Sequence, residues 1–147
     1  MNVAFVHRRL GPVLTTLMLV AVSSGCAKPV KLVPVEGVIE IGGKPAEGIV
    51  VQFLPQASDG EKRPTSFATT GADGTFRLST YDGKQGAVEG MHNVLLADTL
   101  EERPAQGSRA VKPPRLDSRF GTMAGGLTAA VSEGGEAIKL QVPAATP

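Results

Sequence analysis

The feature that most constrains the fold is a series of short runs in which apolar residues recur at every second position, separated by turn residues. Residues that alternate with period two lie on one face of a half-buried strand, whereas a helix repeats them every three or four positions. Turn signals about every 8–12 residues are typical of all-β domains, and we predict a seven-stranded antiparallel β-sandwich. The predicted strands cover residues 35–41, 48–55, 65–70, 76–80, 92–98, 127–131 and 138–142.

Glycine and proline end the first predicted strand. Gly43, Lys44 and Pro45 follow it, and they predict a turn because glycine takes positive φ and proline has no donor for a ladder. The alternation places Phe53 and Phe76 among the inward residues. Replacing either phenylalanine by alanine is expected to cost about 3 to 5 kcal/mol of stability.

Two further turns predict how the strands pair. The dipeptide Asp73-Gly74 stands between the third and fourth runs and is typical of a tight hairpin. The sequence Glu-Gly-Gly-Glu at 133–136 predicts a second hairpin, in which the last run returns against the one before it. Both hairpins fit an antiparallel arrangement.

Cys26 is the only cysteine in the 147-residue chain, and it follows a segment typical of bacterial export. Arg8 and Arg9 precede the apolar stretch 13–22, and small residues occupy 23–25. This order resembles a lipoprotein signal, in which the signal is removed and the thiol of the new first residue is acylated. Cys26 is therefore the predicted lipidation site.

Two alternatives for the same segment stay open. An uncleaved anchor would need about 20 apolar residues to span a bilayer as a helix, and the stretch is shorter. An ordinary secretory signal cut near Ala27 would leave a free thiol. With lipidation, the domains are a signal peptide at 1–25, a lipidated cysteine and extended tether at 26–34, a sandwich at 35–143 and a frayed tail at 144–147.

Charge and composition exclude one class of partner. The chain has 15 basic and 14 acidic residues; the signal holds two of the basic ones, which leaves 13 against 14. With no tryptophan and one tyrosine, the chain also lacks aromatic platforms for stacking bases. We therefore expect no nucleic acid partner.

Several stretches together carry a family resemblance: 35–38, 43–45, 51–55, 72–80, 86–88 and 126–131. In their order and spacing they resemble the carboxypeptidase-regulatory-like, or transthyretin-like, domains of planctomycete lipoproteins. The resemblance implies a prealbumin-like sandwich that lipid anchors in the cell envelope, and it implies no reaction.

Catalytic and metal-binding residues are not expected. His92 is the only histidine after the signal, and it lies in phase with Val94 and Leu96, as a core or hairpin-edge residue would. A nucleophile needs a base and an orienting group nearby, and zinc needs three or four nitrogen or sulfur ligands. The sequence predicts no catalytic residue, no metal and no cofactor.

Residues 99–119 show no usable periodicity, and the part from 103 to 119 is strongly basic. Five cations outweigh Asp117 and give a local charge of about +4, which suits anionic glycan or lipid headgroups. A solvated, flexible loop is the alternative, because no aromatic residue lies between the charges. The candidate ligand-contact residues are Arg103, Arg109, Lys112, Arg115 and Arg119, together with Tyr81.

Together these features predict a lipid-anchored, non-enzymatic structural or binding module of the cell envelope. Its partners would be the membrane, through the lipid, and an envelope protein or glycan. Ala27 after the cysteine favours the outer over the inner membrane. A carbohydrate-binding module is one alternative, for which Tyr81 and Phe120 would be the exposed aromatics, and an enzyme with an unrecognised polar cluster is another.

Overall fold

The alternating runs of the sequence form β-strands at the predicted places. A computed structural model describes residues 30–56, 60, 62–100 and 113–146, and within them the fold is all-β, with no α-helix. Two short 3-10 helices, η1 (Ser118–Gly121) and η2 (Met123–Gly125), precede β10. The strands are β1 (Leu32–Val33), β2 (Glu36–Ile41), β3 (Lys44–Pro45), β4 (Ile49–Pro55), β5 (Ser66–Thr69), β6 (Thr75–Arg77), β7 (Ser79–Thr80), β8 (Ala87–Val88), β9 (Gly90–Asp98), β10 (Thr128–Val131) and β11 (Ile138–Val142).

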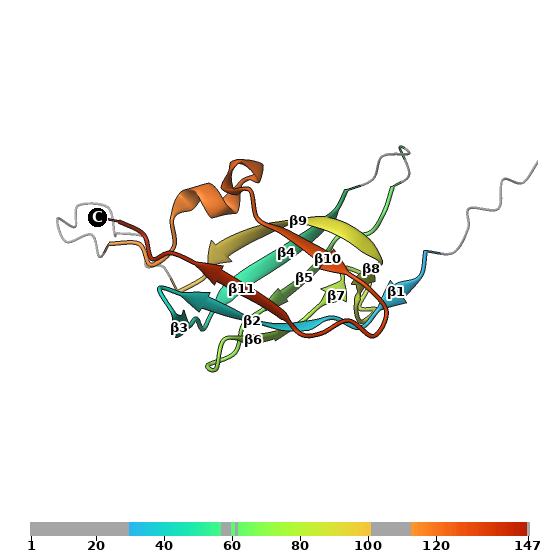
Figure 1. Ribbon diagram of the computed structural model, residues 1–147, viewed down its shortest axis with the longest axis horizontal. Helices are drawn as coiled ribbons and strands as arrows, with labels where there is room; N and C mark the ends of the chain where they lie inside the picture. Colours follow the sequence, from blue (N-terminus) through green and yellow to red (C-terminus); the bar gives the residue numbers. More distant parts are fainter. Residues whose placement is uncertain (1–29, 57–59, 61, 101–112, 147) are drawn as a thin grey trace, which may run out of the picture.

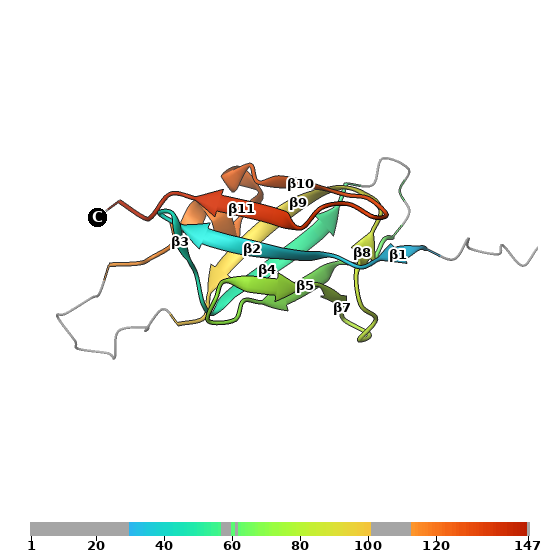
Figure 2. The same ribbon diagram turned by 60° about the horizontal axis from the view of Figure 1, so that its bottom comes forward.

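Two larger sheets lie face to face in a sandwich-like arrangement (Figures 1 and 2). The five-stranded sheet has the order β10-β9-β4-β5-β7, and all its pairs are antiparallel. In the second sheet β2 lies between β11 on one side and β3 and β6 on the other. The short strands β1 and β8 pair with each other at one end of the molecule.

The core lies between the two sheets and consists of the inward positions of the alternation. Ile49, Val51 and Phe53 of β4 have no exposed surface, and Ile39 of β2 faces them from the other sheet. Phe76 is also buried, with its ring 6.3 Å from that of Phe53. The predicted inward residues are therefore confirmed as core residues, and burial of each such side chain contributes about 1.5 to 3 kcal/mol.

The predicted hairpin between the last two strands is wrong. β10 pairs with β9, whereas β11 lies parallel to β2, with Leu140 opposite Ile39 and Val142 opposite Ile41. The chain between them crosses from one sheet to the other, so the sandwich is not purely antiparallel. Alternation of apolar residues determines which face of a strand is buried, but it does not determine which strand lies beside it. Pairing of β11 with β10, as predicted, or with β2, as observed, would bury the same residues of β11 in the core.

The predicted hairpin at Asp73 and Gly74 is present, but part of its second strand pairs with the other sheet. The N–H of Gly71 donates to the carbonyl of Thr75 at 2.9 Å across the turn, and β7 pairs antiparallel with β5. Asp73 Oδ1 accepts hydrogen bonds from the backbone N–H and the hydroxyl of Thr75, and Gly74 takes a φ of 73°. The turn leads from β5 in one sheet to β6 in the other, where β6 pairs with β2. The chain returns at Leu78, and β7 then pairs with β5. A strand that changes sheets at a bend forms a corner of the sandwich.

The turn predicted after the first strand is present at Gly42 and Gly43, but Lys44 and Pro45, predicted as part of it, lie beyond it in a strand. Gly42 and Gly43 have φ values of 58° and 78°, and a two-residue hairpin with positive φ at both positions matches the twist of its strands. Lys44 and Pro45 then form the exposed strand β3. Proline is tolerated there because β3 lies at the edge of its sheet.

Both ends of the domain extend beyond their predicted limits. Leu32 and Val33, expected in the tether, form β1, and Val33 is buried in the core. At the other end, Ala144 bridges to Leu116, and the N–H of Ala145 donates to the carbonyl of Arg115. The tail therefore begins with residues that are hydrogen-bonded rather than frayed.

Candidate functional site

The outward side of the five-stranded sheet carries no charged side chain among the residues that the structure describes. Its strands alternate, so the residues between the buried positions point away from the core. We call this surface the uncharged face. Its members are Val50, Gln52 and Leu54 of β4, Phe67 and Thr69 of β5, Ser79 of β7, Met91, Asn93, Leu95 and Ala97 of β9, and Thr128 and Ala130 of β10.

The register of the strands places aliphatic, aromatic and amide side chains next to one another on this face. Gln52 lies opposite Phe67 on one side and Leu95 on the other. Phe67 is 37% exposed and Met91 47%, so both add apolar surface to the uncharged face. Polar groups on the face are neutral; for example, the amide of Gln56 donates to Asn93 across 2.8 Å.

A hollow of about 180 Å³ lies within the uncharged face. Val50, Gln52, Leu95 and Ala97 line it, and Gly121 of η1 closes one side. Pockets for drug-sized ligands measure about 300–1,000 Å³, so this hollow suits one side chain of a partner better than a whole ligand. Its walls offer apolar contact and one amide, with no titratable group.

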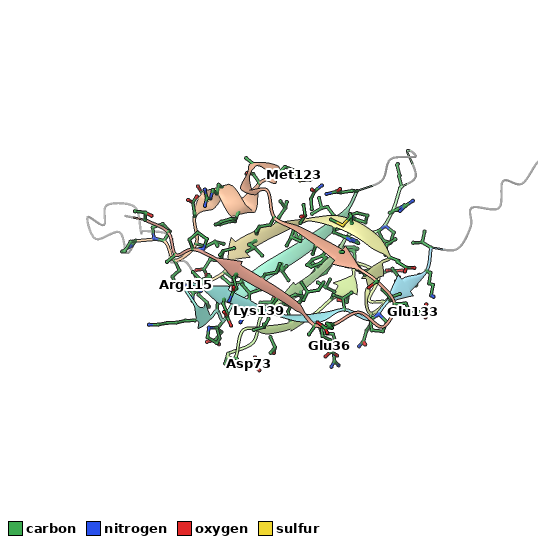
Figure 3. The ribbon with its side chains drawn as sticks, viewed as in Figure 1. Glu36, Asp73, Arg115, Met123, Glu133 and Lys139 are labelled. Carbon is green, nitrogen blue, oxygen red and sulfur yellow. The ribbon has the colours of Figure 1, made fainter. Side chains whose placement is uncertain are left out.

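The outward side of the other sheet, which we call the charged face, is built differently. Glu36 of β2 pairs with Arg77 of β6 at 2.6 Å, and Glu40 pairs with Lys139 of β11 at 2.8 Å. Figure 3 shows Glu36 and Lys139 on this side of the molecule. The hydrogen bonds from Lys139 and Gln141 hold the pKa of Glu40 below its ordinary value. These charges keep the face hydrated.

Arg115, predicted as a ligand contact, is engaged within the domain. Its Nε and Nη2 atoms donate to the carboxylate of Asp98 at 2.7 and 2.6 Å, and Nη2 also donates to the carbonyl of Glu47 at 3.0 Å. The Asp98 side chain is only 1% exposed. Bonding to Asp98 raises the pKa of Arg115, so this cation holds the end of β9 rather than offering itself to a ligand.

The other predicted ligand contacts are not brought together. The guanidinium of Arg119 lies 4.7 Å from the ring centroid of Phe120. Tyr81 is 94% exposed, but it follows β7 at the end of the molecule where β1 lies, whereas Arg115 lies toward the opposite end (Figures 1 and 3). Arg103, Arg109, Lys112 and the lipidation site Cys26 lie outside the described residues.

Phe120, expected as an exposed aromatic, is buried. It is 4% exposed and belongs to the core together with Leu116. β10 pairs only with the first part of β9, and η1 packs beside the remainder, where Gly121 closely approaches the backbone of Leu96. The segment before β10 thus closes an edge of the sandwich, and a periodicity search misses it because it contains no regular strand.

His92 lies in the core, as its phase predicts. Its ring is fully buried, 5.6 Å from the ring of Phe53, and Nδ1 lies 3.1 Å from the carbonyl oxygen of Gly90. Nε2 has no hydrogen-bond partner among the described residues. Burial lowers the pKa of His92, so the neutral imidazole is favoured. In the described ranges no three His, Cys, Asp or Glu side chains gather as metal ligands would.

The uncharged face was not among the sequence predictions, although its signal is present. Once the inward residues of a strand are assigned, the outward residues follow by parity: Val50, Gln52 and Leu54 on one strand, Glu36 and Glu40 on another. What the sequence does not give is the pairing that gathers the neutral strands into one sheet and the acidic strand into the other.

The fold and the two faces define a class, an all-β domain with sandwich-like layers, but comparison assigns it to no family. No protein-family model, curated protein or solved structure matches the chain. Among the described residues there is no helix of the length and apolar character needed to cross a membrane.

Proposed function

We propose that this protein is a lipid-anchored, non-enzymatic binding module of the bacterial cell envelope. Acylation of Cys26 would hold the domain on the membrane, and the resemblance to prealbumin-like sandwiches supports a fold of that type. The observation that carries the proposal is the uncharged face, which leaves apolar surface in water on a domain whose other face is charged. Exposed apolar surface of this kind marks binding sites on soluble domains.

The partner that this face suits is a protein with a neutral, largely apolar surface. A charged ligand would find no counter-ion there, because the face offers only aliphatic, aromatic, hydroxyl and amide groups. With strands about 4.8 Å apart and a rise of about 3.3 Å per residue, the five strands cover roughly 400 Å². That is about half of the roughly 800 Å² per partner of a standard protein interface, which suits a small or transient contact.

The test is photo-crosslinking of the full-length protein in its own cells, followed by mass spectrometry. Leu95→Glu places a charge at the centre of the uncharged face, and we expect it to reduce the captured partner at least tenfold. Val38→Glu is the matched control, since Val38 is also half-buried on a long strand, but on the charged face. It should leave capture unchanged. Equal capture by both variants would contradict binding at the uncharged face.

The same experiment tests the anchor. Cys26→Ser removes the acylation site, and the variant is expected to leave the membrane fraction and to lose the partner. A Cys26→Ser protein that stays wholly with the membrane would contradict lipid anchoring. If capture instead depends on Tyr81 and yields only glycan, the carbohydrate-binding alternative replaces the protein partner.

A further inference from the structure

We infer that the end of the domain at which β1 lies rests on the membrane surface, and that Tyr81 inserts there among the lipid headgroups. This inference depends on the lipid anchor proposed above. It adds an orientation and a second membrane contact, which anchoring through one residue does not require.

The chain between the lipidated Cys26 and the domain is short. Val30 follows Cys26 by four residues, and at about 3.3–3.6 Å per residue those residues reach about 14 Å at most. The domain is engaged from Leu32 onward, because β1 pairs with β8. Figures 1 and 2 show β1 at one end of the molecule, with the C-terminal end of the chain at the other. An acylated Cys26 thus keeps the β1 end close to the bilayer.

The β1 end also displays an exposed aromatic side chain. Tyr81 belongs to the loop between β7 and β8, and its 94% exposure is the highest among the exposed large apolar residues of the described part. Val30, just before β1, is also 41% exposed. Tyrosine prefers membrane interfaces because its ring is apolar and its hydroxyl stays hydrated.

The loop that carries Tyr81 is fixed in place rather than free to fold back. The N–H of Thr80 donates to the carbonyl of Lys84 at 2.8 Å, and its hydroxyl donates to Asp82 at 2.5 Å. Gly86 packs so closely on β1 that a Cβ there would collide with the carbonyl of Val33. The exposure of Tyr81 is therefore built into the fold, beside the strand that leads to the anchor.

The charged side chains at the β1 end determine which lipid headgroups this end can contact favourably. Lys84 pairs with Asp82 at 2.7 Å, and Lys31 pairs with Glu133. Lys28 in the tether adds one positive charge and Glu89 adds one negative charge, so three basic and three acidic residues balance at the β1 end and leave no excess of positive charge for anionic lipid. The contact we propose is with zwitterionic headgroups, through Tyr81.

Tyr81 can serve as an intrinsic fluorescent probe, because it is the only tyrosine in the chain and the chain has no tryptophan. We would purify the full-length protein from its own membranes, reconstitute it in phosphatidylcholine vesicles and confirm anchoring by flotation. Tyr81 fluorescence is then quenched from water with iodide and from the bilayer with phosphatidylcholine carrying a nitroxide near the headgroup. Relative to soluble Cys26→Ser protein, we expect at least twofold protection from iodide, together with nitroxide quenching.

A matched variant moves the fluorophore without changing the anchor. Tyr81→Phe combined with Phe67→Tyr places the single tyrosine on the uncharged face, where we expect free access to iodide and no nitroxide quenching. Floating protein in which Tyr81 is quenched by iodide as freely as in Cys26→Ser overturns the docked orientation and leaves the anchor standing. So does equal nitroxide quenching of both tyrosine positions. Protein that fails to float overturns the anchor, and the orientation with it.

Discussion

The two outer faces of the sandwich are made from strands with the same alternation and differ in what occupies the outward positions. On β2 these positions hold Glu36 and Glu40, whose partners lie on neighbouring strands. On β4 they hold Val50, Gln52 and Leu54. Alternation requires only that one side of a strand be apolar, so the other side is free to serve hydration or association. The difference is why we place binding on the uncharged face.

The largest loss of stability is expected at the contact between β2 and β11, in the sheet that carries the charged face. A Cβ on Gly37 would collide with the carbonyl of Ile138 on β11 and lie 2.5 Å from Cζ of Phe76. Gly37→Ala should therefore destabilise the fold by about 3 kcal/mol, because β11 or Phe76 must shift. Urea denaturation measures this. Gly71→Ala is the control, since its nearest neighbour is 3.4 Å away, and equal stability of the two variants would contradict the parallel β2–β11 pairing.

The next largest loss of stability is expected at Arg115, in the segment that joins the two sheets at one edge. Arg115 binds the buried carboxylate of Asp98 on β9, and the adjacent Leu116 bridges to Ala144 beyond β11. Arg115→Ala removes the guanidinium from a carboxylate that stays buried, and it should cost about 2 to 3 kcal/mol once the partial exposure of the arginine is allowed for. Arg119→Ala, which loses the contact with Phe120 and an exposed ion pair with Asp117, should cost about 0.5 to 1 kcal/mol. Thermal unfolding should rank them in this order.

A smaller change in stability is expected from His92, which lies on the buried side of the sheet that carries the uncharged face. His92 is buried, its pKa is lowered by burial, and in the unfolded chain the pKa returns to the ordinary 6.5. Below that pH the unfolded chain binds more protons, so stability should fall between pH 7 and pH 5. His92→Leu should remove about 1 kcal/mol of this dependence, since burying the charged ring is costly. Urea denaturation at both pH values measures it, and parallel pH profiles for the two proteins would contradict it.

The smallest effect is expected on the charged face itself. The Glu36 and Arg77 side chains are 58% and 63% exposed, and ion pairs this exposed contribute little. Glu36→Gln should change stability by about 0.5 kcal/mol or less, and less still at high salt. A loss above about 1 kcal/mol in urea denaturation would mean that the charged face holds the fold together.

Local signals predicted the elements well and their neighbours poorly. The inward sets of β4 and β9 follow from period two, because burial imposes the alternation directly. The hairpin predicted from Asp73 and Gly74 closes as expected, but the pairing of β6 with β2 within it was not predicted, because that partner depends on distant residues. β11 shows the same limit, because its partner β2 lies about 100 positions away in the sequence.

The site was harder to predict than the fold. A local charge count selected Arg115 as a ligand contact, but tertiary structure pairs it with Asp98, far from Tyr81. The uncharged face is a property of five strands together, and no single stretch of sequence displays it. Among the predicted ligand contacts, the exposure of Tyr81 could be recognised in advance, because a lone tyrosine in a glycine-punctuated loop has little chance of entering the core.

The parallel pairing of the first long strand with the last one has a consequence for how the chain matures. A chain synthesised from its N-terminus holds β2 without β11 until residue 142 has been added, since Gly37 pairs with Ile138. Closing so long a loop is entropically costly and makes assembly slow. The second sheet therefore stays incomplete during most of the synthesis of the domain, and removal of β11 would leave β2 without its partner on that side.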